Sequence, residues 1–147
     1  MKTKGVLGKN LLQAINTKGT EHTLEFCSSK AIALTDSMAV SLNAKIKRVS
    51  DKNRNPNNRA NDAELAYIKT SKAALSEGKE ILPQLTTIGD KQIGYYPIMT
   101  GQMCLQCHGG KGKEIVTSTL DKIEHLYPQD LATGYQVNQL RGIWVVE

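Results

Sequence analysis

Residues 82–108 read Leu-Pro-Gln-Leu-Thr-Thr-Ile-Gly-Asp-Lys-Gln-Ile-Gly-Tyr-Tyr-Pro-Ile-Met-Thr-Gly-Gln-Met-Cys-Leu-Gln-Cys-His. Two β-prone runs, Leu82 to Ile88 and Lys91 to Met99, flank the two-residue turn signal Gly89-Asp90, so the first part of this stretch predicts a β-hairpin. The pattern Cys-x-x-Cys-His follows directly after the second run. The sequence therefore predicts that a cysteine and histidine cluster lies at the end of a sheet strand.

The Cys-x-x-Cys-His pattern predicts covalent attachment of a c-type haem. Cys104 and Cys107 lie about one helical turn apart, so both thiols can reach the two vinyl groups of one porphyrin. His108 can present an imidazole nitrogen to the iron as the proximal ligand. A redox Cys-x-x-Cys would not need the adjacent histidine, and a zinc site needs a second pair of ligands that the cysteines do not supply. We therefore expect one covalently attached haem c.

The composition is typical of one globular domain. The chain has 147 residues, of which 39% are hydrophobic and 22% charged, with a net charge of +5. This length suffices for one core and is too short for two ordinary domains, so we expect a single domain over residues 1–147. The sequence has no arginine-rich run with interleaved aromatic residues, which argues against a nucleic-acid partner. The longest apolar runs span only a few residues, so no transmembrane stretch is predicted.

The cofactor also predicts a location. Covalent haem attachment normally takes place outside the bacterial cytoplasm, so we expect a periplasmic or otherwise extracytoplasmic protein. No signal peptide is evident, because the apolar residues near the N-terminus are helix-spaced and interrupted by polar ones. We therefore expect that a leader or membrane anchor once preceded Met1, and that any membrane contact runs through such an anchor.

Apolar spacing and capping signals predict the other elements and the fold class. Strands separated by unequal insertions suggest an α+β fold, with an antiparallel sheet, helices on one side of it and two helices at the N-terminus. In the N-terminal part we expect a helix over 5–16, a break at Gly19-Thr20 with Thr20 as N-cap, and a long helix to about Leu42. A strand over Lys45–Val49 and a loop over Asn53–Arg59 should follow, and then a helix that an Asn61/Glu64 capping box opens and that runs to about Ser76. After the haem motif we expect a helix over Ile115–Leu126 and a strand over Leu140–Val146.

The residue opposite His108 on the iron separates electron carriers from sensors and enzymes. No methionine follows His108, so the usual distal ligand of small cytochromes is missing. His125 lies downstream and could give bis-histidine ligation, although its neighbours are typical of a helix end. Cys27 is the odd cysteine once the haem has taken two, and it lies on the apolar stripe of its predicted helix, where a small buried hydrophobe is the alternative. On the residues alone, Cys27 stands about level with His125 and a vacant position taken together.

Several short sequence blocks along the chain together resemble a known family. Apart from the haem motif, no single block is specific, but five blocks in this order are. The blocks are Cys27 in Phe-Cys-Ser-Ser-Lys-Ala, Arg48-Val-Ser50 followed by Arg54-Asn55-Pro56-Asn57, then Tyr96-Pro97-Ile98, then Cys104-Leu-Gln-Cys107-His108-Gly109, and last Tyr127-Pro128-Gln-Asp130-Leu-Ala132-Thr-Gly134-Tyr135, closed by Arg141-Gly142.

In these blocks the chain resembles the single-haem c-type domains with a PAS-like fold, which occur in bacteria as small extracytoplasmic cytochromes and as sensor modules ahead of histidine kinases and chemoreceptors. The resemblance implies a PAS-like antiparallel sheet flanked by helices, with His108 as proximal and Cys27 as distal ligand. It also implies that Arg48 or Arg54 lies beside the haem, where a guanidinium could pair with a propionate. For Arg54, a turn held by asparagine side chains is an equal alternative. Asn138 stands where the family tends to show glycine, and asparagine tolerates left-handed geometry.

The haem motif is compatible with three functions. A sensor would change shape when the iron changes redox state or exchanges Cys27 for a small ligand such as carbon monoxide or nitric oxide. An electron carrier would hold its ligands rigidly and pass electrons to a redox partner protein. An enzyme is not expected, because no His, Arg or Asp is placed by sequence as a distal acid or base and a six-coordinate iron would block substrate. We expect an extracytoplasmic haem-based redox or gas sensor, with an electron-transfer cytochrome as the alternative.

Overall fold

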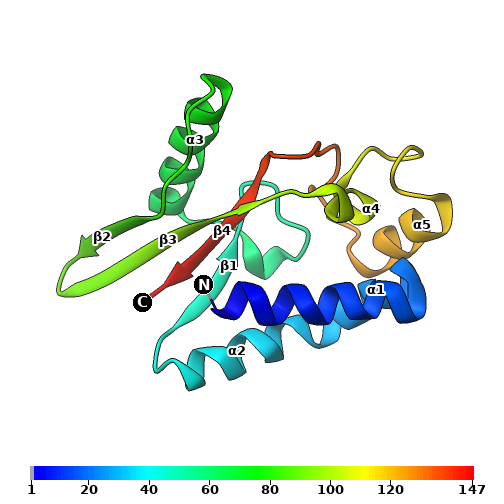
Figure 1. Ribbon diagram of the computed structural model, residues 1–147, viewed down its shortest axis with the longest axis horizontal. Coiled ribbons are helices and arrows are strands. Elements are labelled where there is room, and N and C mark those ends of the chain that lie inside the picture. The colour runs from blue at the N-terminus through cyan, green and yellow to red at the C-terminus, as the bar shows by residue number, and fades with distance from the viewer. Residues whose placement is uncertain (1) are drawn as a thin grey trace.

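The computed structural model describes the backbone of residues 2–147 and the side chains of all of these except residues 2–4, 6 and 7. Four strands form one antiparallel sheet in the order β1-β4-β3-β2 (Figure 1). The expected α+β fold with an antiparallel sheet is confirmed. The strands are β1 (Ile46–Val49), β2 (Gln84–Ile88), β3 (Lys91–Met99) and β4 (Leu140–Val146).

The last strand of the chain lies in the middle of the sheet. β4 pairs with β1 on one side and with β3 on the other, so the four-stranded sheet requires the C-terminal residues of the chain. Gly142 is needed for this close pairing, because a Cβ atom there would lie 2.5 Å from the carbonyl oxygen of Val49. In the turn two residues before β4, Asn138 adopts a φ of 62°, the left-handed geometry that asparagine was expected to tolerate there.

Helices cover both faces of the sheet, so the expectation of helices on one side is wrong. Helix α3 (Asp62–Ser76) packs on one face, whereas α1 (Lys2–Ser29) and α2 (Ala31–Ser41) lie across the other (Figure 1). The alternation of side chains along β1 is the physical reason. Lys47 bonds to Glu64 of α3 at 2.5 Å, and its neighbour Arg48 points to the opposite face, where it interacts electrostatically with Cys27 of α1.

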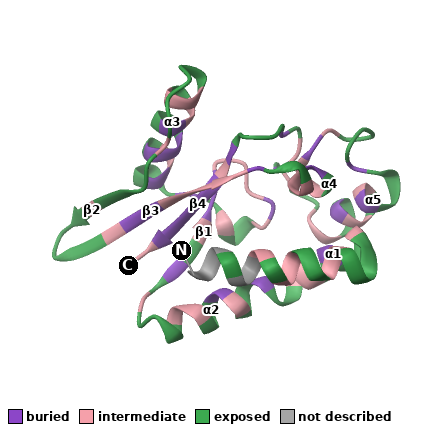
Figure 2. Cartoon of the chain, in the orientation of Figure 1, coloured by how far each residue is buried: buried purple, intermediate pink, exposed green. Residues whose placement is uncertain are grey.

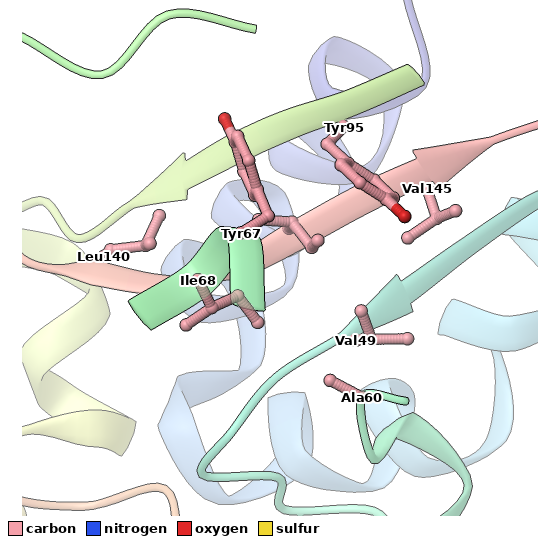
Figure 3. Packing of buried hydrophobic residues seen from close by; sticks show 8 residues of the cluster. Val49, Ala60, Tyr67, Ile68, Tyr95, Leu140 and Val145 are labelled. Atoms are coloured by element: carbon pink, nitrogen blue, oxygen red, sulfur yellow. The ribbon is translucent and has the colours of Figure 1, made fainter. Parts of the chain in front are cut away.

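The main core lies between α3 and the sheet (Figure 3). Tyr67 of α3 and Tyr95 of β3 place their ring centroids 5.2 Å apart, and Tyr67 donates its hydroxyl proton to the carbonyl of Leu82. The predicted capping box opens α3, with Asn61 and Glu64 bonding reciprocally to each other's backbone N–H. Figure 2 shows buried segments along β4 and the α3 surface that faces it.

The N-terminal helices differ in their bounds from the expectation. The predicted break at Gly19 exists as a kink inside α1, with φ 79° and ψ 173°. The expected Thr20 cap is wrong, since the Thr20 hydroxyl donates instead to Gln106 Oε1 at 3.1 Å. The expected long helix is interrupted at Lys30, which separates α1 from α2. The expected helix over 5–16 lies inside α1, although two of its apolar side chains, Val6 and Leu7, lie outside the described residues.

The segment that follows β3 carries the remaining short elements. They are η2 (Gln102–Cys104), α4 (Leu105–His108) and α5 (Thr117–Leu126), and the earlier loop contains η1 (Pro56–Asn58). Within the described part of the chain, no helix combines the length and the apolar character needed to span a membrane.

Candidate functional site

The Cys-x-x-Cys-His motif forms the one-turn helix α4 and the 3-10 turn before it. Leu105 is buried and anchors α4, while Cys104 and Cys107 are half-buried. The N–H of Gly101 donates to Cys104 Sγ at 3.3 Å. Burial raises the pKa of the Cys107 thiol to about 11, with the nearby Arg54 opposing the shift. Two thiols one turn apart are therefore presented from a fixed helical turn, as attachment to one porphyrin requires.

The ring of His108 is held in one tautomer. Its Nδ1 lies 2.7 Å from the carbonyl oxygen of Ala132, and because a carbonyl can only accept, Nδ1 must carry the proton. Nε2 then keeps a lone pair that can bind a metal. Burial, reinforced by nearby Arg141 and Arg54, lowers the pKa of His108 well below its usual value. The imidazole is therefore neutral and oriented, which is the state of a metal-ligating histidine.

The loop over residues 127–135 is fastened to the exit of α4. The N–H of Gly134 donates to the carbonyl of Gly109 and the N–H of Tyr135 to that of His108, both at 2.8 Å. The Tyr135 ring meets the His108 ring edge-on, with centroids 6.3 Å apart. These bonds bring the Ala132 carbonyl to His108 across 24 residues of sequence.

Arg54 lies beside His108 and the 127–135 loop, and its hydrogen bonds are to protein groups. Its Nε and Nη2 atoms pair with the two carboxylate oxygens of Asp130, at 3.0 and 3.1 Å. Nη2 also donates to the carbonyls of Cys107, at 2.6 Å, and Ala132, at 3.3 Å. The pairing of Arg54 with a haem propionate stays a prediction, whereas its bonds to Asp130 and to the haem motif are present in this structure.

Cys27 reaches this cluster from α1. Burial raises the pKa of its thiol, while Arg48 and Arg54 act in the opposite direction. Cys27 and Cys107 are also near enough to interact electrostatically, although they lie 80 positions apart in the sequence. Arg48 of β1 stacks over the Trp144 ring, with its guanidinium 5.5 Å from the ring centroid, and it interacts electrostatically with Cys27.

A small second core holds α1 against the haem motif. Leu24 of α1 packs with Ile115 and Ile123 of the α5 region, and Cys107 lies against them. A bond from Lys122 Nζ to Glu25 adds a polar contact between the same helices. By contrast, His125 is exposed in the last turn of α5, and no interaction among the described residues joins it to Cys107 or His108.

Three buried donors near the cluster have no acceptor. Tyr135 Oη, Arg141 Nε and Trp144 Nε1 are buried and unpaired among the described side chains. Tyr135 and Arg141 lie side by side, with the guanidinium 5.5 Å from the ring centroid, but their polar atoms miss hydrogen-bonding geometry. Buried donors of this kind are rare unless a further group pairs them. A haem carries two carboxylates that could accept from such donors, and together with two thiols one turn apart and a neutral, oriented His108 the residues present fit that group.

Sequence reasoning found Cys27, Arg48, Arg54 and the haem motif, and the structure brings all of them together. It missed the roles of Asp130, the Ala132 carbonyl, Tyr135 and Arg141. All four stand in the block that carried part of the resemblance, but nothing in their spacing shows which atoms face His108.

Comparison with known proteins supports the same architecture. The chain superimposes on the crystal structure of the cyanobacterial heme-protein Tll0287 with a TM-score of 0.66 and 22% sequence identity, covering 82% of this chain and 69% of that one. At this identity the likeness is evidence for the fold alone. No curated protein matches the chain. A family model described as Tll0287-like matches residues 4–147, nearly the whole chain, and the chain therefore belongs to the Tll0287-like family.

Proposed function

We propose that this chain binds one haem c through Cys104 and Cys107, with His108 as proximal and Cys27 as distal ligand, in a PAS-like domain that acts as an extracytoplasmic redox or gas sensor. The observation that carries the proposal is the meeting of Cys27 with the haem motif at one half-buried place, beside a neutral His108. The solved relative Tll0287 is itself described as a heme-protein, which supports the cofactor.

Each residue of the site has a definite task. Cys104 and Cys107 would hold the porphyrin covalently, and His108 would give Nε2 to the iron. Cys27 would hold the sixth position as a thiolate, a state that the positive charges of Arg48 and Arg54 favour against the effect of burial. Bound haem supplies an iron that can change its oxidation state and accept carbon monoxide or nitric oxide. Because His108 and Cys27 would both be used to hold the iron, we infer a sensing or electron-transfer role and no enzymatic one.

The placement of Cys27 favours a sensor over a carrier. Cys27 lies on a ten-residue helical piece that begins after the Gly19 kink and ends at the Lys30 break. The Gly19 kink separates this piece from the first half of α1, whereas the bond from Leu34 N–H to the carbonyl of Lys30 joins it to α2, so residues 20–29 can shift together with α2. On reduction Cys27 would leave the iron, and residues 20–29 would move relative to the sheet.

The electron-carrier alternative has one observation in its favour. The proximal side is rigid. Five hydrogen bonds of 2.6–3.3 Å join the segment Cys107–Gly109, the 127–135 loop and Arg54 to one another. A carrier needs that rigidity on both sides of the iron. The alternative therefore turns on whether Cys27 stays bound in both redox states.

The test uses protein made with cytochrome c maturation. Denaturing mass spectrometry should show one added haem, and haem that extracts into acidified acetone would refute covalent attachment. Carbon monoxide added to reduced protein should shift the Soret band, and hydrogen exchange should rise over residues 20–29 on reduction. No carbon monoxide binding together with unchanged exchange would favour the carrier. Replacing the exposed His125 with alanine is the matched control, since it should leave both readouts unchanged.

A further inference from the structure

The carbonyl oxygen of Ala132 is a point where two donors meet. His108 Nδ1–H donates to it at 2.7 Å and Arg54 Nη2 at 3.3 Å. Ala132 is fully buried, so bulk water does not reach this oxygen and cannot replace either donor. The position of this one carbonyl therefore determines which nitrogen of His108 carries the proton and where the ring points.

Asp130 and Arg54 together fix that carbonyl. Asp130 Oδ1 accepts from the N–H of Ala132 at 2.9 Å, which closes a tight turn around the residue. The same carboxylate pairs with Arg54 Nε and Nη2 in the fork-to-fork geometry that only a guanidinium offers. Only 10% of the Arg54 side chain and 7% of the Asp130 side chain are exposed, so solvent does not loosen the pair.

The same guanidinium also grips the haem motif. Arg54 Nη2 donates to the carbonyl of Cys107 at 2.6 Å, one residue before His108. One side chain thus joins the loop that follows β1, the turn α4 and the 127–135 loop. Neighbouring bonds follow the same route, with Lys52 Nζ donating to the carbonyl of Thr133 and Leu131 N–H to that of Asn53.

We propose that Arg54 and Asp130 are positioning residues of the haem site, which hold the Ala132 carbonyl and the Cys107 peptide so that His108 keeps Nδ1 protonated and Nε2 free for the iron. The inference rests on the proposed function, because an iron ligand is what needs a ring fixed in this way. In this role Arg54 does not pair with a propionate, since its Nε and Nη2 atoms are already bonded to Asp130 and to the carbonyls of Cys107 and Ala132.

The first test compares haem-loaded variants by resonance Raman spectroscopy of the ferrous iron–histidine stretch and by electron paramagnetic resonance of the ferric form. Arg54→Met and Asp130→Asn should both shift or split the iron–histidine band and broaden the ferric signal. Arg54→Lys should restore the spectra only in part, since an ammonium cannot bond to both carboxylate oxygens and two carbonyls together. Glu64→Gln is the matched control, because it removes the buried carboxylate that pairs with the half-exposed Lys47 on the other face of the sheet.

Three results would overturn the proposal. Spectra of Arg54→Met identical to wild type would show that the ring does not depend on the pair. An equal change in Glu64→Gln would show a general loss of stability, and full recovery in Arg54→Lys would show that charge alone matters.

A second test separates this proposal from the haem itself. Long-range nitrogen–proton correlation spectra of the haem-free chain should show His108 as a single Nδ1–H tautomer in wild type and as a mixture in Arg54→Met. That result in a chain that never takes up haem would sustain the positioning role while the proposed function fails. Normal haem loading with a tautomer indifferent to Arg54 would sustain the function and overturn the positioning role.

Discussion

Replacing Arg54 with methionine should destabilise the fold far more than a surface substitution. The change leaves the Asp130 carboxylate nearly buried with the Ala132 N–H as its remaining donor, because both bonds from the guanidinium disappear. It also removes the donor of the Cys107 carbonyl, whereas the Ala132 carbonyl keeps its bond from His108.

The magnitude follows from these losses. Removing one partner of a buried ion pair typically costs about 3–5 kcal/mol, because the other charge remains without compensation. Methionine retains much of the side-chain volume, so we expect little added cost from a cavity and a total of about 4 kcal/mol. In the double variant Arg54→Met/Asp130→Asn the orphaned charge is gone, and about 2 kcal/mol should be recovered. A recovery of this kind is the signature of an unpaired charge as opposed to lost packing.

Urea unfolding followed by circular dichroism measures the effect. With an m-value of about 2 kcal/mol/M, the midpoint of Arg54→Met should fall by about 2 M. Lys79→Met is the matched control, since it removes an exposed ion pair with Glu77 and should change stability by less than about 0.5 kcal/mol. A loss below about 1 kcal/mol in Arg54→Met, or a double variant that is less stable still, would show that Asp130 is not left as an uncompensated buried charge.

Three further outcomes are expected. Cys27→Ser should convert a low-spin ferric haem to a high-spin or water-ligated one, and an unchanged paramagnetic resonance spectrum would exclude Cys27 as a ligand. The hydrogen bond from Lys122 lowers the pKa of Glu25. The ion pair between α1 and α5 should therefore be fully formed above the ordinary pKa of a glutamate and be lost as the pH falls through the lowered pKa. Amide hydrogen exchange over the two helices should accordingly increase at acid pH in the wild type, and this pH dependence should be weaker in Glu25→Gln. Gly142→Ala should cost about 1–3 kcal/mol in urea unfolding, because its Cβ meets the β1 backbone, whereas Gly8→Ala, with open space around it, should be neutral or stabilising.

Elements with local signals could be predicted closely. The Gly89-Asp90 turn and the Asn61/Glu64 capping box each consist of neighbouring residues, and β3 and α3 have the expected bounds. The break at Lys30 was missed because the apolar stripe runs on across it and no glycine or proline marks it. The sequence did not predict that helices cover both faces of the sheet. That arrangement depends on the pairing of Lys47 with α3, and no sequence pattern links these two segments.

The site divides in the same way. Cys104, Cys107 and His108 can be recognised from the sequence because their spacing alone indicates haem attachment. The contribution of Ala132 could not be predicted, since it acts through a backbone carbonyl that every residue possesses. Asp130 was visible only as part of a resemblance, because its partner Arg54 lies 76 positions away and neither residue has a spacing that points to the other.

The two sides of the proposed haem site differ in stiffness, and this difference bears on how the proposed sensor would respond. His108 is held by the haem turn, the 127–135 loop and the loop that contains Arg54, three segments joined by buried bonds. Cys27 is held by one helical piece. Among the described residues, this piece contacts α4, α5 and the residue after α5 through the Leu24 cluster, the exposed Thr20–Gln106 and Glu25–Lys122 bonds and a bond between Ser28 and Tyr127. Strain at the site is relieved where the fewest buried bonds must break. We therefore infer that a change at the iron is carried outward through residues 20–29 and α2, and that the proximal side serves as the fixed reference against which they move.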